Sequence, residues 1–140
     1  QPLQAVVAST MLRTLHERLN RRREIQHKLD EALANLAPRV VVPRRERLNA
    51  ETVSLYMVLV ERRDELLEHL VAKGVEAKVH YPIPLHLQKA ADSLGYGPGS
   101  MPTAERQAGQ LLTLPAHEYL NSDQINFTVS VVEQHVKFSG

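Results

Sequence analysis

Hydrophobic residues recur every three or four positions through the first quarter of the chain. This spacing puts them on one helix face and predicts a single helix over residues 3–36, which ends before Pro38. At ~1.5 Å per residue the helix would be about 50 Å long, more than the diameter of a small domain. We therefore expect it either to bend or to cover something other than this domain.

After Pro38, strand and helix patterns alternate. Branched and aromatic residues predict strands at 40–42 and 53–60, and the nearly continuous apolar character of the second indicates a central strand. The remaining expectations are a helix over 61–73 that ends at Gly74, a strand over 75–81, a short helix over 85–94, a loop over 95–99, a helix over 102–112, an extended segment over 112–115, and a closing helix whose inward stripe runs from Ile125 to Val136.

This order predicts an α+β fold, with a small mixed or antiparallel sheet covered by helices and preceded by the long linking helix. We assign the linking helix to residues 1–37 and a small C-terminal α+β domain to residues 38–140. Asn121 and Gln124 have the spacing of a capping box at the start of the closing helix. Glu105 lies near the positive end of the helix predicted at 102–112.

Composition narrows the classes of partner. The 140 residues carry 17 Lys and Arg against 16 Asp and Glu, a net charge of +1, which implies neither nucleic acid nor an acidic membrane as a partner. The sequence has no cysteine, no span of membrane length and no signal peptide, so we expect a cytoplasmic protein. Arginines cluster at positions 18 and 21–23; with acidic neighbours and no aromatics, they indicate a solvated helix face or a contact with another domain.

The most distinctive segment is His80–Gln88, which holds two histidines, a tyrosine and two prolines after a predicted strand. The prolines stiffen it into an irregular path, suited to present polar side chains to a ligand. The alternative is a plain exit from the sheet with solvated histidines. His80, His86 and His117 are not accompanied by a zinc-binding motif, and no serine lies in a nucleophile elbow, so we predict neither a metal site nor catalytic residues in this chain.

The order of several short motifs resembles the C-terminal part of the DegT/StrS-type sugar aminotransferases, and the resemblance covers essentially the whole chain. The His-Tyr-Pro-x-Pro-Leu-His segment is its specific part. The other matching motifs are Leu3-Gln4-Ala5-Val6, Arg63-Asp64-Glu65-Leu66, Gly74-Val75, Ala104-Glu105, Leu112-Thr113-Leu114-Pro115-Ala116-His117, Tyr119-Leu120 and Gln124-Ile125.

The resemblance implies the small domain of a fold type I enzyme that uses pyridoxal 5'-phosphate (PLP) to transfer an amino group from glutamate or glutamine to a nucleotide-linked keto sugar. It also implies a homodimer. The family's cofactor residues lie upstream of this segment, and none of the five lysines has the setting of its Schiff-base lysine, so we expect PLP in the full-length parent and none on this chain alone. By resemblance, His80, Tyr81 and His86 are the expected substrate-binding residues.

Two positions depart from the family's pattern: Ser54 stands where a histidine is common, and Glu118 where a proline is common. The family also places the first helix against its large domain, so residues 3–20 should expose an apolar stripe in this chain. The alternative function is a free-standing module of the same fold that binds a sugar nucleotide, or mediates dimerisation, without catalysis.

Overall fold

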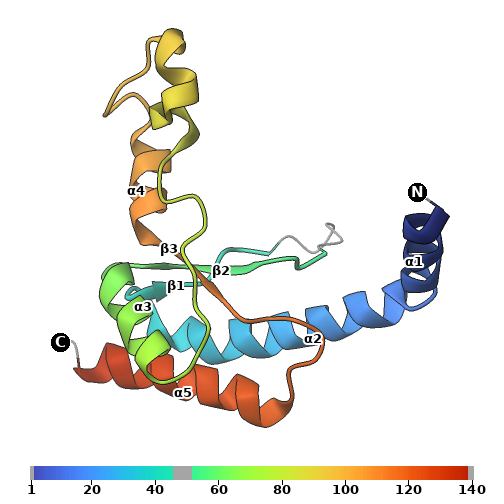
Figure 1. Cartoon of the computed structure of the whole chain (residues 1–140). Coiled ribbons are helices and arrows are strands. Elements are labelled where there is room, and N and C mark those ends of the chain that lie inside the picture. Colours follow the sequence, from blue (N-terminus) through green and yellow to red (C-terminus); the bar gives the residue numbers. More distant parts are fainter. Residues whose placement is uncertain (1, 46–51, 139–140) are drawn as a thin grey trace.

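A computed structural model describes residues 2–45 and 52–138 of the chain. Helices and a small sheet form its body, from which residues 81–110 project as an arm (Figure 1). The elements are α1 (Pro2–Leu12), α2 (Leu15–Leu33), η1 (Ala34–Leu36), β1 (Val40–Val41), β2 (Tyr56–Val60), α3 (Arg63–Ala72), η2 (Leu85–Leu87), η3 (Lys89–Leu94), α4 (Pro102–Gln110), β3 (Leu111–Leu114) and α5 (Ser122–Phe138).

The sheet is antiparallel with the order β1-β2-β3, which confirms the predicted α+β fold and the central place of β2. Val40 pairs with Val60, and Tyr56 pairs with Leu114 at the other end of β2. Alternate residues of β2 are buried, so one face of the strand packs on the helices and the other is half open. The predicted extended segment at 112–115 is a true strand, one residue earlier.

The strand predicted over 75–81 was wrong in extent. Only Lys78 pairs with β3, through two backbone hydrogen bonds to Thr113 of 3.1 and 2.8 Å. The preceding residues are held elsewhere, because the N–H of Val75 donates to Leu70 across the helix end at Gly74, whose φ is +82°. Pro82 then has no N–H to continue a ladder.

The core lies between the sheet and helices α2, α3 and α5, and α5 packs on both α2 and α3 (Figure 1). The capping box at α5 is confirmed, because Asn121 and Gln124 exchange hydrogen bonds of 3.0 and 2.9 Å. The fully buried side chains are Ile25, Leu29, Leu33, Val40, Tyr56, Val58, Leu66, Leu70, Leu112, Leu114, Val131 and Val132.

The long helix predicted over 3–36 is broken. Turns at Arg13 and Thr14 separate α1 from α2, and both N–H groups bond three residues back rather than four. The hydroxyls of Thr10 and Thr14 add side-chain bonds to the carbonyls of Val6 and Met11, a competition that weakens a helix locally. Helix α1 buries no residue, which confirms the expected exposed stripe over its length.

The predicted helix over 85–94 is also divided, into the 3₁₀ helices η2 and η3, because the backbone at Gln88 is extended. Helix α4 begins with Pro102 in its first turn, as the sequence indicates, and gives way to β3 at Leu111. The arm therefore consists of two stretches of chain, one leaving the sheet after His80 and one returning to it along α4.

Candidate functional site

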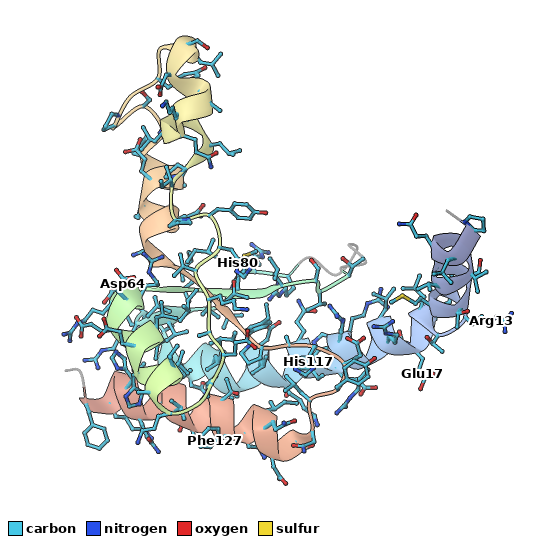
Figure 2. All side chains as sticks on the ribbon, in the orientation of Figure 1. Arg13, Glu17, Asp64, His80, His117 and Phe127 are labelled. Carbon is cyan, nitrogen blue, oxygen red and sulfur yellow. The ribbon has the colours of Figure 1, made fainter. Side chains whose placement is uncertain are left out.

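His80 is fixed to the sheet at the base of the arm (Figure 2). Its Nδ1 lies 2.9 Å from the hydroxyl of Thr113 on β3, next to the backbone pairing of Lys78 with the same residue. Tyr81 follows with its side chain 74% exposed and its ring centroid 6.4 Å from that of His80. The structure thus brings these two predicted substrate residues together.

The backbone of Tyr81 is strained. Its φ is 58°, in the left-handed region, which costs a residue with a side chain roughly 1–2 kcal/mol. Strained backbone of this kind is concentrated at ligand sites and switches. Here it turns the chain abruptly between His80, bound to β3, and Pro82, which enters the arm.

His86, the third predicted residue, faces the arm instead of the sheet. It is only 7% exposed, and its Nε2 lies 3.0 Å from Oε1 of Glu105 on α4. The carboxylate also accepts hydrogen bonds from the N–H groups of Gly99 and Met101. These backbone bonds, and then the bond with His86, lower the pKa of Glu105.

Two hollows meet at His80, and Leu55 also lines both of them. The first, of about 240 Å³, lies over β3 and the middle of α2; several charged and polar side chains line it together with apolar ones, and we call it the polar hollow because it is the more polar of the two. The second, of about 710 Å³, is an apolar groove between the arm and the sheet. The polar hollow is lined in part by Arg22, Glu76, Lys78, Thr113 and His117, and the apolar groove by Met57, Tyr81, Leu85, His86, Tyr96 and Met101.

Of the arginine cluster on α2, Arg22 lines the polar hollow, and three members bond to the loop after β3, which corrects the expectation of a solvated face. Arg18 and Arg22 donate through Nε to the two carboxylate oxygens of Glu118, at 2.6 and 2.7 Å. Arg21 donates to the carbonyl of Leu120, at 2.9 Å. The loop after β3 is therefore bound to α2 within this chain.

Glu118 is held as a buried anion. Its side chain is 5% exposed, and a hydrogen bond from its own backbone N–H, with those from Arg18 and Arg22, keeps its pKa at about 2 although burial acts in the opposite direction. Two charged hydrogen bonds to one carboxylate are strong and directional. Glu118, which stands where the resemblance leads us to expect a proline, therefore anchors the loop that carries His117.

Sequence reasoning missed four residues of the site. Lys78 carried a signal, because a residue two positions before His80 on an extended segment lies on the same face. Nothing in the sequence paired Thr113 with His80, or placed Arg22 and His117 in one hollow, since those contacts join segments far apart in the chain.

The residues of the polar hollow do not by themselves fit PLP. Among the described residues, Lys78 is the only lysine that lines one of the two hollows. Its ammonium group is exposed and lies 2.5 Å from a carboxylate oxygen of Glu76. None of the glycines in the described part of the chain lines the polar hollow, so it has no glycine backbone to hold the cofactor's phosphate.

Within residues 2–45 and 52–138, no three residues of the types His, Cys, Asp and Glu are grouped as a metal ion requires. In the same part of the chain, no helix combines the length and the apolar character of a membrane span.

Comparison with known proteins identifies relatives over nearly the whole chain. The erythromycin biosynthesis sensory transduction protein EryC1 of Saccharopolyspora erythraea is 32% identical over 131 residues, which cover 94% of this chain and 36% of that protein. The dTDP-3-amino-3,4,6-trideoxy-alpha-D-glucose transaminase of Streptomyces venezuelae is 40% identical over 80 residues, 57% of this chain and 21% of that protein.

Solved structures agree with these relatives. The crystal structure of S. venezuelae DesV matches with a TM-score of 0.90 and 33% identity, covering 96% of this chain and 36% of that one. A DegT DnrJ EryC1 StrS aminotransferase from Brucella abortus matches with a TM-score of 0.86 and 30% identity, covering 94% and 34%. The chain matches only 21–36% of the length of the curated relatives first matched. The sequence pattern of one family matches residues 1–133, and the chain belongs to that family, the DegT/DnrJ/EryC1/StrS aminotransferases.

Proposed function

We propose that this chain is the C-terminal domain of a PLP-dependent aminotransferase that acts on a nucleotide-linked keto sugar. The observation that carries the proposal is the pair of hollows that meet at His80, one polar and one apolar, on a chain of this family. A sugar nucleotide has the same two characters, a charged diphosphate beside a flat, weakly polar base. Relatives named as transaminases of dTDP-linked and UDP-linked sugars support this substrate class.

His80 and Tyr81 are proposed to bind the substrate directly. Because Nδ1 of His80 is engaged with Thr113, its Nε2 is left to the substrate, and the direction of the Thr113 bond decides whether Nε2 donates or accepts. The exposed phenol of Tyr81 can donate to a phosphate oxygen or a sugar hydroxyl. His86 is proposed to close the apolar groove, which it lines.

PLP would supply the electron sink for amino transfer in the parent enzyme. The residues described here do not complete its site, so we assign this chain the wall of the cleft and no catalytic residue. We further propose a cytoplasmic homodimer with glutamate or glutamine as amino donor, as the family resemblance implies. The exposed apolar side chains of α1 support the proposal that this helix packs against another protein surface.

The direct test uses the protein expressed from the whole reading frame that contains this chain. Incubation with PLP, an amino donor and dTDP- or UDP-linked keto sugars should yield the corresponding amino sugar, detected by mass spectrometry. Absence of amino sugar with all of these substrates, in protein that is folded and carries PLP, would contradict the proposal.

Variants test the residues. His80→Ala should raise KM for the nucleotide sugar about tenfold, the loss expected for one hydrogen bond to a charged group. The matched control is His27→Ala, an exposed histidine on α2 that lines neither hollow, which should leave KM unchanged. An unchanged KM in both variants would remove His80 from the substrate site.

A further inference from the structure

Glu105 joins three parts of the arm through one side chain. It belongs to the first turn of α4, and its Oε1 lies 3.0 Å from His86 Nε2, 3.0 Å from Gly99 N and 3.0 Å from Met101 N. Its Oε2 lies 2.9 Å from Gly99 N. His86 comes from the stretch that leaves the sheet and the other two donors from the loop that returns to it, so the carboxylate holds the two stretches together.

Helix capping explains only part of this arrangement. A carboxylate at a helix start that accepts the N–H of the N-cap residue, here Met101, is an ordinary cap. A cap does not require His86, which lies 19 positions earlier in the sequence. The pairing with His86 therefore connects the cap of α4 to the segment that carries the proposed substrate residues.

His86 is the anchor of that segment. Among residues 81–88, all of which the structure describes, it is the only buried one, whereas Tyr81 is 74% and Leu85 77% exposed. A segment with so little buried apolar surface is fixed by its few specific bonds. The hydrogen bond between His86 and Glu105 attaches this segment to α4, and a bond to a carboxylate is charge-assisted.

We propose that Glu105 is a positioning residue, which holds His86 and so sets the place of Tyr81 beside the apolar groove without contacting the substrate. This inference rests on the proposed function, because it assigns Glu105 an effect on nucleotide-sugar binding. Nothing in the arrangement gives Glu105 a role toward the amino donor, which lacks the nucleotide.

The test compares Glu105→Gln with wild type in the protein from the whole reading frame. A glutamine offers one carbonyl oxygen and an N–H₂ in place of two anionic oxygens, so it cannot accept all the bonds of Glu105. KM for the nucleotide sugar should rise about tenfold, and amide exchange at Gly99 and Met101 should accelerate by a similar factor. The rate of the PLP absorbance change with amino donor alone should stay unchanged.

Further variants separate positioning from general damage. Arg106→Gln alters the neighbouring exposed residue of α4, which bonds only Gln110 in the same helix among the contacts of the described chain, and should change neither readout. Combining Glu105→Gln with His86→Ala should cost no more in KM than His86→Ala alone, since both remove the same anchor. If Glu105→Gln fails to fold, Glu105→Asp, which is one methylene shorter, is measured in its place.

The outcomes are distinct. Faster exchange at Gly99 and Met101 with an unchanged KM would overturn the positioning role and leave a simple cap. Additive effects in the double variant would overturn the route through His86. Wild-type protein that binds no nucleotide sugar would overturn the proposed function and this inference with it, whereas failure of the Glu105 variant alone to change KM leaves the proposed function standing.

Discussion

Glu118 shows how one side chain can fix a loop that its sequence leaves undefined. Both carboxylate oxygens are occupied by guanidinium groups from α2, and the side chain is almost fully buried. Removing its charge leaves Arg18 and Arg22, each about a quarter to a third exposed, without their common partner. The loop that carries His117 would then lose its main attachment to the body of the protein.

We therefore expect Glu118→Gln to lower the free energy of unfolding by about 1–3 kcal/mol, measured by urea denaturation at pH 7. The matched control is Glu24→Gln, whose exposed pair with Arg21 should contribute less than ~1 kcal/mol. Equal stability of the two variants would mean that the attraction between Glu118 and its two arginines only compensates for the cost of removing these charges from water.

Glu118 also predicts that the protein loses stability as the pH falls into the acid range. Its pKa is about 2 in the folded protein and about 4.5 ordinarily, so the unfolded state binds the proton more readily. The contribution of Glu118 is complete above pH 4.5 and is lost as the pH falls toward 2. Between pH 5 and 2.5 the stability gap between wild type and Glu118→Gln should narrow; a constant gap would contradict the lowered pKa.

At the scale of elements, the contact between α3 and α5 contains a histidine pair. The ring centroids of His69 and His135 lie 5.4 Å apart, and Nε2 of His69 is buried with no hydrogen-bond partner in the described structure. Burial and the neighbouring charges of His69 and Arg62 lower the pKa of His135, while Glu65 acts in the opposite direction.

A lowered histidine pKa means that the folded state resists protonation. Stability is therefore full above pH 6.5, the ordinary value for His135, and declines as the pH falls below it. His135→Gln should show a smaller drop in urea midpoint between pH 7.5 and 5.5 than wild type, whereas His27→Ala, on an exposed surface, should behave as wild type. Identical drops in all three proteins would exclude His135 as the titrating group.

Local patterns predicted the elements whose causes are local. The capping box at Asn121 and the left-handed end at Gly74 depend on a few neighbouring residues, and both are present. The strand expected over 75–81 was wrong because its pairing depended on the helix end before it and on β3 far along the chain. The break at Thr14 depended on hydroxyl bonds that hydrophobic periodicity does not report.

In the candidate site, too, the features with local causes were predicted and those that depend on distant segments were not. His80 and Tyr81 were predicted from an unusual local motif and do lie together at the base of the arm. The partners that position them, Thr113 and Glu105, come from segments more than 18 residues away and had no pairing signal in one sequence. Glu105 was expected only to favour a helix dipole, and its further bonds required the folded arm.

At the scale of the whole molecule, α1 is an apolar helix without a covering surface. It stands at the end of α2, away from the sheet (Figure 1), and none of its residues is buried. Leu3 is 76%, Val6 63% and Leu12 64% exposed. Apolar patches of this kind mark interaction surfaces or drive association.

The 140-residue chain should therefore self-associate through α1 at micromolar concentrations, observed by sedimentation velocity. The pair Val7→Gln and Met11→Gln removes two exposed apolar side chains and keeps helix-compatible residues, so it should weaken association by at least about tenfold. Val71→Gln, which alters an exposed apolar residue on α3, should not weaken it. A wild-type chain that stays monomeric, with α1 amides strongly protected from exchange, would show that this helix is stable without a partner surface and would remove the argument that another part of a larger protein covers it.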